Sequence, residues 1–336
     1  MLIGAPYIGG KIPHLYAPPP EPVSVSSEPK TPVDVWNHGT ATEYINGGVR
    51  YGTIKTIGQV QEWWYDNKEL PQVDIHKPVL FVQGFVAPPG QFATVLNHLT
   101  ADGRNGGAPV YIQDGKFFSD SDCTEAMEPT ADSKVFRLIH DPLASPEIIA
   151  DKMALAKEAM NSLTGEDKPD VIAHSLGGLG ARIFADRGNR LGKLAMVGSP
   201  NQGSRAAMLT KAALVNGITW ATTLAHVSPA ALPALEWMTP VISGNEKLEA
   251  LNSRWENQEQ HLDDAIIFGV TGFQSPSSVK EMEPGDGLIE SSSLGVGDLK
   301  VQTFEVDSCR KGHYTMVNDP EIFRGYSDFL GWTPAA

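Results

Sequence analysis

Cysteine and positive charge are both scarce in this chain of 336 residues. Its two cysteines allow one disulfide and exclude a zinc site built from cysteines. The 40 acidic side chains outnumber the 26 lysines and arginines, which gives a formal net charge of −14 at pH 7. An excess of negative charge disfavours nucleic acids and electrostatic capture by anionic membranes. We therefore expect no nucleic acid partner.

Long apolar runs are also absent. No segment approaches the roughly 18–20 apolar residues of a membrane-spanning helix, so no transmembrane segment is expected. Residues 1–11 lack the charged start and apolar core of a signal peptide. Either the protein stays inside the cell or a signal peptide has been removed, which leaves the localisation open.

The two cysteines, Cys123 and Cys309, are candidates for one disulfide. Cys309 lies four residues before His313, and Cys123 follows a predicted strand at 108–112. A bridge would brace the loop that contains His313 and would favour a secreted or periplasmic protein. The alternative is two unrelated thiols, and the sequence does not decide between them.

Proline is concentrated in residues 1–37, which predicts an extended N-terminal arm. Residues 38–336 are long enough for one α/β domain with insertions. The Asn-Gly-Gly sequence at 46–48 predicts a hairpin, and the strand-like residues at 53–57 are expected to continue the antiparallel start of a sheet. The aromatic residues at 63–65 are expected to pack this start onto the core.

From residue 78 onward, strand-like and helix-like patterns alternate. The strand after 79–84 is either 108–112 or 135–139, and we prefer 108–112, with 114–134 as an insertion. A strand, a helix and a strand follow at 169–174, 176–187 and 192–198. This alternation predicts a mostly parallel sheet with helices on both faces and a functional site at the carboxyl edge.

A serine with small neighbours follows one of these strands. Residues 171–178 read Val-Ile-Ala-His-Ser-Leu-Gly-Gly, so Ser175 lies between a short apolar strand and a helical pattern. A serine on such a sharp turn takes a strained backbone conformation, which requires nearly side-chain-free residues two positions before and after it. Ala173 and Gly177 meet this requirement. The pattern predicts a nucleophile elbow with Ser175 as the nucleophile.

A nucleophilic serine needs a histidine to remove its proton and a carboxylate to orient that histidine. In chains with this elbow, the acid and then the histidine follow the serine. Three histidines lie downstream. His226 lies in an apolar stretch, and His261 precedes a strand and so lies at the wrong end of the sheet. His313 follows the alternating segment 301–306 and a polar turn, and we predict that it is the base.

The acid is expected in the loop after the strand at 265–271. Glu281, Glu283 and Asp286 all lie there, and Asp286 is preferred because its flanking glycines let the backbone bend and expose the carboxylate. The alternative for Asp286 is an ordinary solvated turn residue. His174, beside the nucleophile, is expected to be a packed or hydrogen-bonded strand residue rather than a second base.

Two backbone N–H groups are needed to stabilise the negative charge that develops on the substrate oxygen. One is expected from Leu176, the residue after the nucleophile. The other is expected from the turn after an earlier strand. Residues 78–85 supply such a strand and a glycine turn, which makes Phe85 the second predicted donor.

Residues 206–244 contain only two charged side chains, Lys211 and Glu236, among many apolar ones. The stretch is inserted between the strands at 192–198 and 265–271. An apolar cap over a serine nucleophile would bind acyl chains and exclude water. The alternative is that these residues simply form core.

Taken together, these motifs resemble the α/β-hydrolase superfamily and, within it, the bacterial true lipases of the pseudomonad and bacillus kinds. The matching pieces are 79–85, 108–112, 173–178, 198–204, 286–289 and His313, in the family's order. The resemblance implies an α/β-hydrolase fold with an apolar helical cap at about 201–260. It also implies carboxylic-ester hydrolysis through an acyl-serine intermediate, without an organic cofactor.

The chain departs from this family in two ways. Gln83 stands where a histidine is commoner, and about seventy N-terminal residues have no counterpart. Some of these lipases hold a structural calcium near the histidine loop, where Asp319 lies, but no ligand set matches and we assign no metal.

The function predicted from the sequence is therefore a serine ester hydrolase that acts on small-molecule or lipid esters with apolar acyl groups. The same acyl-serine would serve an acyltransferase, a thioesterase or an amidase. A non-catalytic binding protein is disfavoured, because such a protein has no need of all three triad residues. The oligomeric state stays open.

Overall fold

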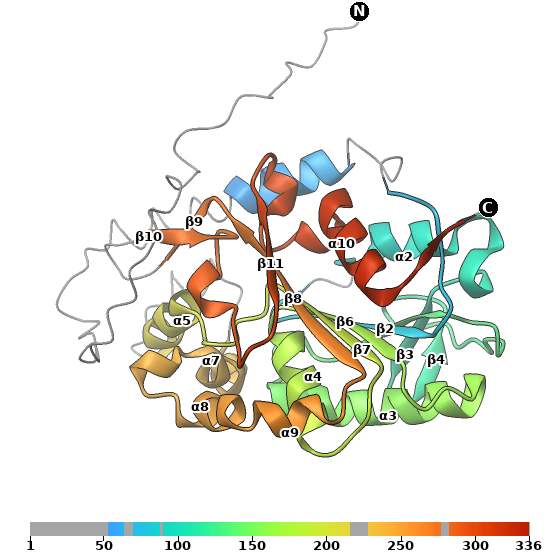
Figure 1. Cartoon of the computed structure of the whole chain (residues 1–336), viewed down its shortest axis with the longest axis horizontal. Helices are drawn as coiled ribbons and strands as arrows, with labels where there is room; N and C mark the ends of the chain where they lie inside the picture. The colour runs from blue at the N-terminus through green and yellow to red at the C-terminus, as the bar shows by residue number, and fades with distance from the viewer. Residues whose placement is uncertain (1–52, 64–69, 88–89, 216–227, 277–281, 336) are drawn as a thin grey trace, which may run out of the picture.

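The computed structural model describes residues 53–63, 70–87, 90–215, 228–276 and 282–335 (Figure 1). The predicted arm over 1–37 and the predicted hairpin at 46–48 lie outside these residues, so both stay predictions. Residues 216–227 of the predicted cap, including His226, lie outside them as well.

Within the described residues, eight strands form one sheet in the order β11-β8-β7-β6-β2-β5-β3-β4. Neighbouring strands are parallel, except that β4 is antiparallel to β3. The strands are β2 (Val79–Val82), β3 (Val110–Gln113), β4 (Lys116–Phe118), β5 (Val135–Leu138), β6 (Asp170–His174), β7 (Lys193–Val197), β8 (Asp264–Thr271) and β11 (Val301–Glu305). This arrangement confirms the predicted mostly parallel α/β sheet.

The two candidate segments 108–112 and 135–139 both contribute a strand. β3 is the next strand along the chain, as expected, but β5 lies between β2 and β3 in the sheet. All residues of β5 are buried, which suits a central parallel strand. The segment 114–134 is more than an insertion, because it contains β4, which pairs with β3 at the edge of the sheet.

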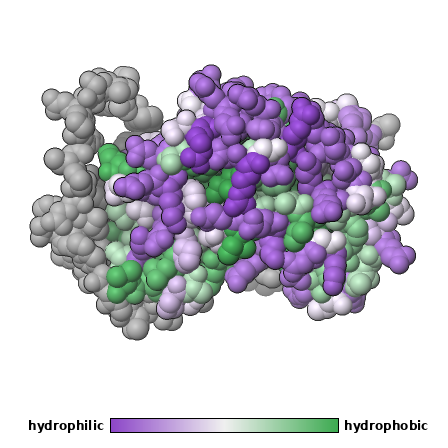
Figure 2. Space-filling model, turned by 90° about the horizontal axis from the view of Figure 1, so that it is seen from below, coloured by the Kyte–Doolittle hydropathy of each residue, from purple (hydrophilic) through white to green (hydrophobic). Residues whose placement is uncertain are grey.

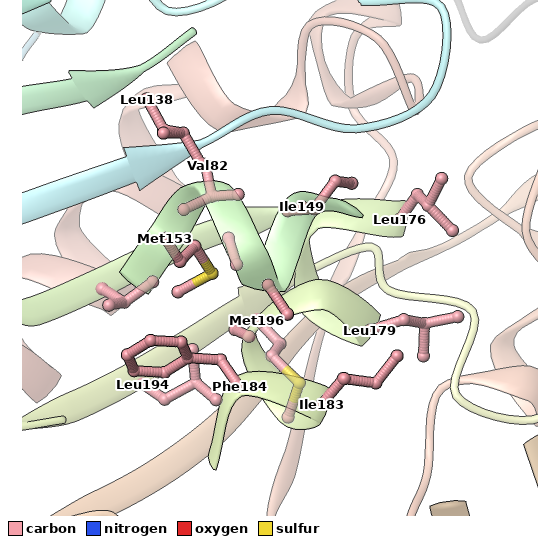
Figure 3. Packing of buried hydrophobic residues seen from close by; sticks show 14 of the residues in the cluster. Val82, Leu138, Ile149, Met153, Leu176, Leu179, Ile183, Phe184, Leu194 and Met196 are labelled. Atoms are coloured by element: carbon pink, nitrogen blue, oxygen red, sulfur yellow. The ribbon is translucent and has the colours of Figure 1, made fainter. Parts of the chain in front are cut away.

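Helices cover both faces of the sheet. α3 (Pro146–Thr164) and α4 (Leu176–Asp186) lie on one face, and α2 (Ala93–Thr100) and α10 (Pro320–Leu330) lie on the other (Figure 1). Residues of β2 alternate between the two cores, with Leu80 packed toward α3 and α4 and Phe81 packed toward α2 and α10. Figure 3 shows the first core, where side chains from β2, α3, α4 and β7 pack together.

Residues 53–63 form a helix, so the prediction of strands at 53–57 is wrong. The β-branched residues there favour a strand, but Ile54 and Gly58 lie one helical turn apart and are both buried. A Cβ on Gly58 would lie 2.5 Å from the carbonyl oxygen of Cys309. Close packing against this loop therefore overrides the local preference. Trp63 is 77% exposed, so its predicted packing is also wrong, and residues 64–65 lie outside the described part.

Between β7 and β8 the described chain is helical. Its elements are α5 (Arg205–Val215), η3 (Pro229–Ala231), α7 (Leu232–Met238), η4 (Val241–Ser243), α8 (Glu246–Ser253) and α9 (Trp255–Glu259). Leu235 of α7 is 1% exposed and belongs to the same core as α3 and α4. α7 therefore forms part of the core, which was the alternative to a cap. Most side chains of α5 that can be assessed are only half-buried, and Val215 at its end is 65% exposed.

A buried arginine ties α4 to this helical segment. The guanidinium of Arg182 donates to the side-chain oxygens of Gln258 at 2.9 Å, Asn201 at 3.0 Å and Asn252 at 2.9 Å. Burial lowers the pKa of Arg182 to about 9, so the side chain is still positively charged at neutral pH. Three amide oxygens therefore hold α4, the helix that begins directly after Ser175.

Shorter elements complete the described chain: β1 (Val73–Asp74), η2 (Ala101–Gly106), β9 (Phe273–Pro276), β10 (Met282–Gly285), η5 (Ser291–Ser293), η6 (Cys309–Lys311), η7 (Met316–Asn318) and β12 (Thr333–Pro334). None of the helices in the described ranges is long and apolar enough to cross a membrane. Figure 2 shows a mostly hydrophilic face, with hydrophobic residues most evident toward the side where Figure 1 places α5, α7 and α8.

Glu290 links the loop after β10 to the start of α5. Its side chain is buried, with 3% exposed, and Oε1 accepts a hydrogen bond from the backbone N–H of Arg205 at 3.1 Å. Among the described residues, Oε2 has no hydrogen-bond partner. Burial is the main cause that raises the pKa of Glu290 from 4.5 to about 7.

This raised pKa predicts a loss of stability with rising pH. Folding favours the neutral carboxyl, so its stabilising contribution is complete below pH 4.5 and is lost as the pH rises through about 7. At about 1.4 kcal/mol per pKa unit, the loss between pH 5 and pH 8 is on the order of 3 kcal/mol. Urea unfolding of Glu290→Gln should show a smaller fall over this interval than the unchanged protein.

Glu158→Gln is the matched control, because it makes the same substitution at an exposed carboxylate of α3, away from Glu290. This control should keep the full pH dependence. An equal fall in Glu290→Gln and the unchanged protein would contradict the prediction.

Candidate functional site

Ser175 lies on a sharp turn between β6 and α4. Its backbone has φ 54° and ψ −126°, a strained conformation for a residue with a side chain. Neighbouring residues must therefore be small. A Cβ on Gly177 would lie 2.7 Å from the carbonyl oxygen of Gln83, and a side chain in place of Gly84 would put its Cβ 2.6 Å from that of Ser175. The turn agrees with the predicted elbow.

The structure brings Ser175, His313 and Asp286 together. Nε2 of His313 lies 2.9 Å from Oγ of Ser175, and Nδ1 of His313 lies 2.7 Å from Oδ2 of Asp286. All three side chains are buried. A carboxylate only accepts, so Nδ1 carries the proton when His313 is neutral, and Nε2 is then free to accept the hydroxyl proton of Ser175.

Asp286 is held firmly by its own loop. Its Oδ1 accepts backbone hydrogen bonds from Leu288 at 3.0 Å and Ile289 at 2.7 Å, and its carbonyl oxygen accepts one from His313 at 2.9 Å. Because Asp286 is 1% exposed, it is not a solvated turn residue. Among the other candidates, Glu283 pairs instead with Arg205, and Glu281 lies outside the described residues.

His261, which was considered and rejected as the base, and Asp319, which lies after the histidine loop, have other partners. His261 precedes β8, and its Nδ1 contacts the carbonyl oxygen of Asn257 at 2.8 Å. Asp319 caps α10 by accepting backbone hydrogen bonds from Glu321 and Ile322. Among the residues described, no group of three or more His, Cys, Asp or Glu side chains is arranged to hold a metal.

Both cysteines are free thiols in the structure, so the alternative of two separate thiols holds there. Cys123 is half-buried and Cys309 is buried. Burial is the main cause that raises the pKa of each thiol to about 11. The argument for an oxidising compartment, which rested on a bridge, therefore has no support from this structure.

Both predicted oxyanion donors belong to segments at Ser175: Leu176 follows it directly in the chain, and Phe85 follows Gly84, which packs against it. Leu176 is buried at the start of α4, and Phe85 lies half-buried in the turn after β2. This turn is braced next to Phe85, because the N–H of Val86 donates to the carbonyl oxygen of Pro142 at 2.8 Å. In addition, the hydroxyl of Tyr314, the residue after His313, donates to the carbonyl oxygen of Val86 at 3.3 Å.

The side chain of Gln83 also supports the turn after β2. Its Oε1 accepts a hydrogen bond from Nη2 of Arg137 at 2.8 Å, and its Nε2 donates to the carbonyl oxygen of His140 at 3.3 Å. Arg137 is fully buried in β5, and burial lowers its pKa to about 10. The sequence showed only that glutamine here replaces a commoner histidine. It gave no indication that Arg137 is buried beside Gln83, because an arginine is ordinarily expected at the surface.

No family model and no curated protein sequence matches the chain. Among solved structures, a Bacillus licheniformis lipase in its mature form matches with a TM-score of 0.50 and 13% identity, over 76% of this chain and 91% of that chain. A Listeria innocua gene product matches with a TM-score of 0.49 and 16% identity, over 77% and 94%. A Paleococcus ferrophilus monoacylglycerol lipase matches with a TM-score of 0.40 and 14% identity, over 76% and 96%.

Identities this low bear on the fold alone. The strand order, with parallel β7, β6, β2 and β5 at its centre, and the likeness to the Bacillus structure agree with each other. The chain therefore has the α/β-hydrolase fold.

Proposed function

We propose that this protein is a serine carboxylic-ester hydrolase of the lipase and esterase type, with Ser175, His313 and Asp286 as its catalytic triad. The observation that carries the proposal is the buried, hydrogen-bonded series from Asp286 through His313 to Ser175. The α/β-hydrolase fold adds support, because the matched Bacillus protein is a lipase. Ester hydrolysis is therefore the first activity to test.

The reaction follows from the direction of these hydrogen bonds. Oγ of Ser175 attacks the ester carbonyl carbon while Nε2 of His313 takes the hydroxyl proton. Asp286 keeps the imidazole oriented and stabilises its positive charge. The same proton then passes to the departing alkoxide, which leaves as the alcohol and yields the acyl-serine. A water molecule, activated by His313, attacks the acyl-serine and releases the acid.

The negative oxygen of each tetrahedral intermediate is stabilised by the backbone N–H groups of Phe85 and Leu176 in this proposal. Donors fixed before the reaction begins are effective because they need no reorganisation as charge develops. Support for this assignment comes from the bracing of the turn after β2, on one side by Gln83 and on the other by Tyr314.

The substrates proposed are esters with apolar acyl groups, and the insertion at about 201–260 acts as their cap. Of its described helices, α7, α8 and α9 all place buried side chains in the core, which leaves the mostly half-buried α5 as the element to contact acyl chains. Met208, Leu209 and Leu214 of α5 are half-buried, so they expose apolar surface to a bound ligand.

Ser175→Ala should abolish hydrolysis of p-nitrophenyl esters, because it removes the covalent route. We expect kcat to fall on the order of 10⁴-fold or more. A fluorophosphonate should label the unchanged protein at Ser175, as read by peptide mass spectrometry. Ser327→Ala, which changes a buried serine of α10, should keep its activity and its labelling. Labelling of another residue would overturn the assignment of the nucleophile.

The acid can be tested with a matched pair of carboxylates. Asp286→Asn should lower kcat by about 10³- to 10⁴-fold, because the amide favours the wrong tautomer of His313. Glu283→Gln should retain activity, since Glu283 pairs with Arg205 away from His313. Near-normal turnover in Asp286→Asn, measured with the same esters, would remove Asp286 from the triad.

Gln83→Leu should lower kcat by about 10- to 100-fold with little change in KM, because a loosened turn misplaces the Phe85 N–H. Gln113→Leu, the same substitution in β3, is the control and should leave kcat unchanged. Steady-state kinetics on a soluble ester decide the matter. A folded Gln83→Leu protein with normal kcat would show that the turn needs no support from this side chain.

A further inference from the structure

His174 lies between the base and the turn that follows β2. It is buried at the end of β6, and its Nε2 contacts the carbonyl oxygen of His313 at 2.7 Å. Its Nδ1 contacts Nε2 of Gln91 at 2.9 Å. The rings of His174 and His313 have centroids 4.7 Å apart. The imidazole of His174 therefore contacts His313, the proposed base. It forms no hydrogen bond with the side chain of Ser175 in the described structure.

The hydrogen-bond partners determine the tautomer of His174. The carbonyl oxygen of His313 only accepts, so Nε2 of His174 must carry a proton. In the neutral ring, Nδ1 must then accept a hydrogen bond, and the amide nitrogen of Gln91 donates it. Burial, followed by the neighbouring His313, holds the pKa of His174 well below 6.5. His174 therefore stays neutral and does not compete for the proton that His313 takes.

Gln91 is itself fixed by the loop that follows the base. Nδ2 of Asn318 donates to the backbone carbonyl oxygen of Gln91 at 2.8 Å, and both side chains are buried. The contacts therefore run in a closed path, from His313 to His174, then to Gln91, and back through Asn318 to the chain just after His313. Such a path restrains the backbone of the base from two directions.

His174 also limits the position of the turn after β2. A Cβ on Gly84 would lie 3.2 Å from Nδ1 of His174 and 3.0 Å from its carbonyl oxygen. The ring therefore fills the space beside Gly84, next to the turn that carries Phe85. Movement of His174 would disturb the base and this turn together.

We propose that His174 is a positioning residue for the ester hydrolase reaction. Its Nε2–H donates a hydrogen bond to the carbonyl oxygen of His313 and so fixes the imidazole of His313 against Ser175. This inference rests on the proposed function. It assigns His174 no bond to the substrate and no share of the transferred proton. Its effect is on the geometry of proton transfer, which is sensitive to displacements of about 1 Å.

Two amide substitutions separate the two nitrogens of His174. A glutamine at this position reaches roughly as far as Nε2 and keeps a donor for the His313 carbonyl. An asparagine ends near the position of Nδ1, so it keeps the contact with Gln91 but loses that donor. His174→Asn should lower kcat by about 10- to 100-fold with KM nearly unchanged, whereas His174→Gln should stay within about fivefold of the unchanged protein.

The measurements are steady-state kinetics on a soluble p-nitrophenyl ester and the rate of fluorophosphonate labelling, with thermal unfolding to verify the fold. Labelling should slow in parallel with kcat in His174→Asn, because it uses the same base. Equal losses in the two variants would overturn the proposal, since His174 would then act only by filling space. Normal kcat in both would overturn it as well.

A second variant keeps the proposal testable if His174→Asn does not fold. His174→Met fills much of the same space but has no donor for the His313 carbonyl oxygen. We expect its kcat to fall about 10- to 100-fold, and a kcat equal to that of His174→Gln would overturn the proposal. Failure of the proposed function itself is recognised separately, because the unchanged protein would then neither hydrolyse esters nor label at Ser175.

Discussion

The strained turn at Ser175 is the constraint on which the site depends. A serine at φ 54° stays there only if its surroundings exclude other conformations. The turn after β2 does this from one side, where Gly84 lets the two backbones approach. On the other side, a Cβ on Gly178 would lie 2.0 Å from Oγ of Ser199, so α4 packs closely against the chain after β7. Small residues therefore provide the close packing that holds Ser175 in this conformation.

The parallel sheet brings the other groups to this turn. β6 lies at its centre between β2 and β7, so the segment after β2 runs directly beside Ser175. β8 and β11 end along the same edge, and the loops that follow them supply Asp286 and His313. Residues far apart in sequence therefore meet because their strands end together. Ser175, His313 and Asp286 therefore all lie at the same edge of the sheet.

The parts that the sequence predicted are those with a local physical requirement. Ser175 needs small neighbours at fixed spacing, and Asp286 was preferred for its flanking glycines, so both could be proposed from local patterns in the chain. The helix over 53–63 was missed because its β-branched residues favour a strand, and only the close approach of Gly58 to Cys309 explains the helix. The central place of β5 and the buried roles of Arg137 and Gln91 depend on partners distant in sequence, which no local pattern indicates.

One loop, the one after β10, supports both Asp286 and the start of α5. The loop after β10 holds Asp286 through the N–H groups of Leu288 and Ile289, and its next residue, Glu290, holds the start of α5. A displacement of this loop would therefore move Asp286 together with the helix proposed to contact acyl chains. Because the carboxyl of Glu290 is buried and changes its charge near pH 7, the strength of this shared support depends on pH in the neutral range.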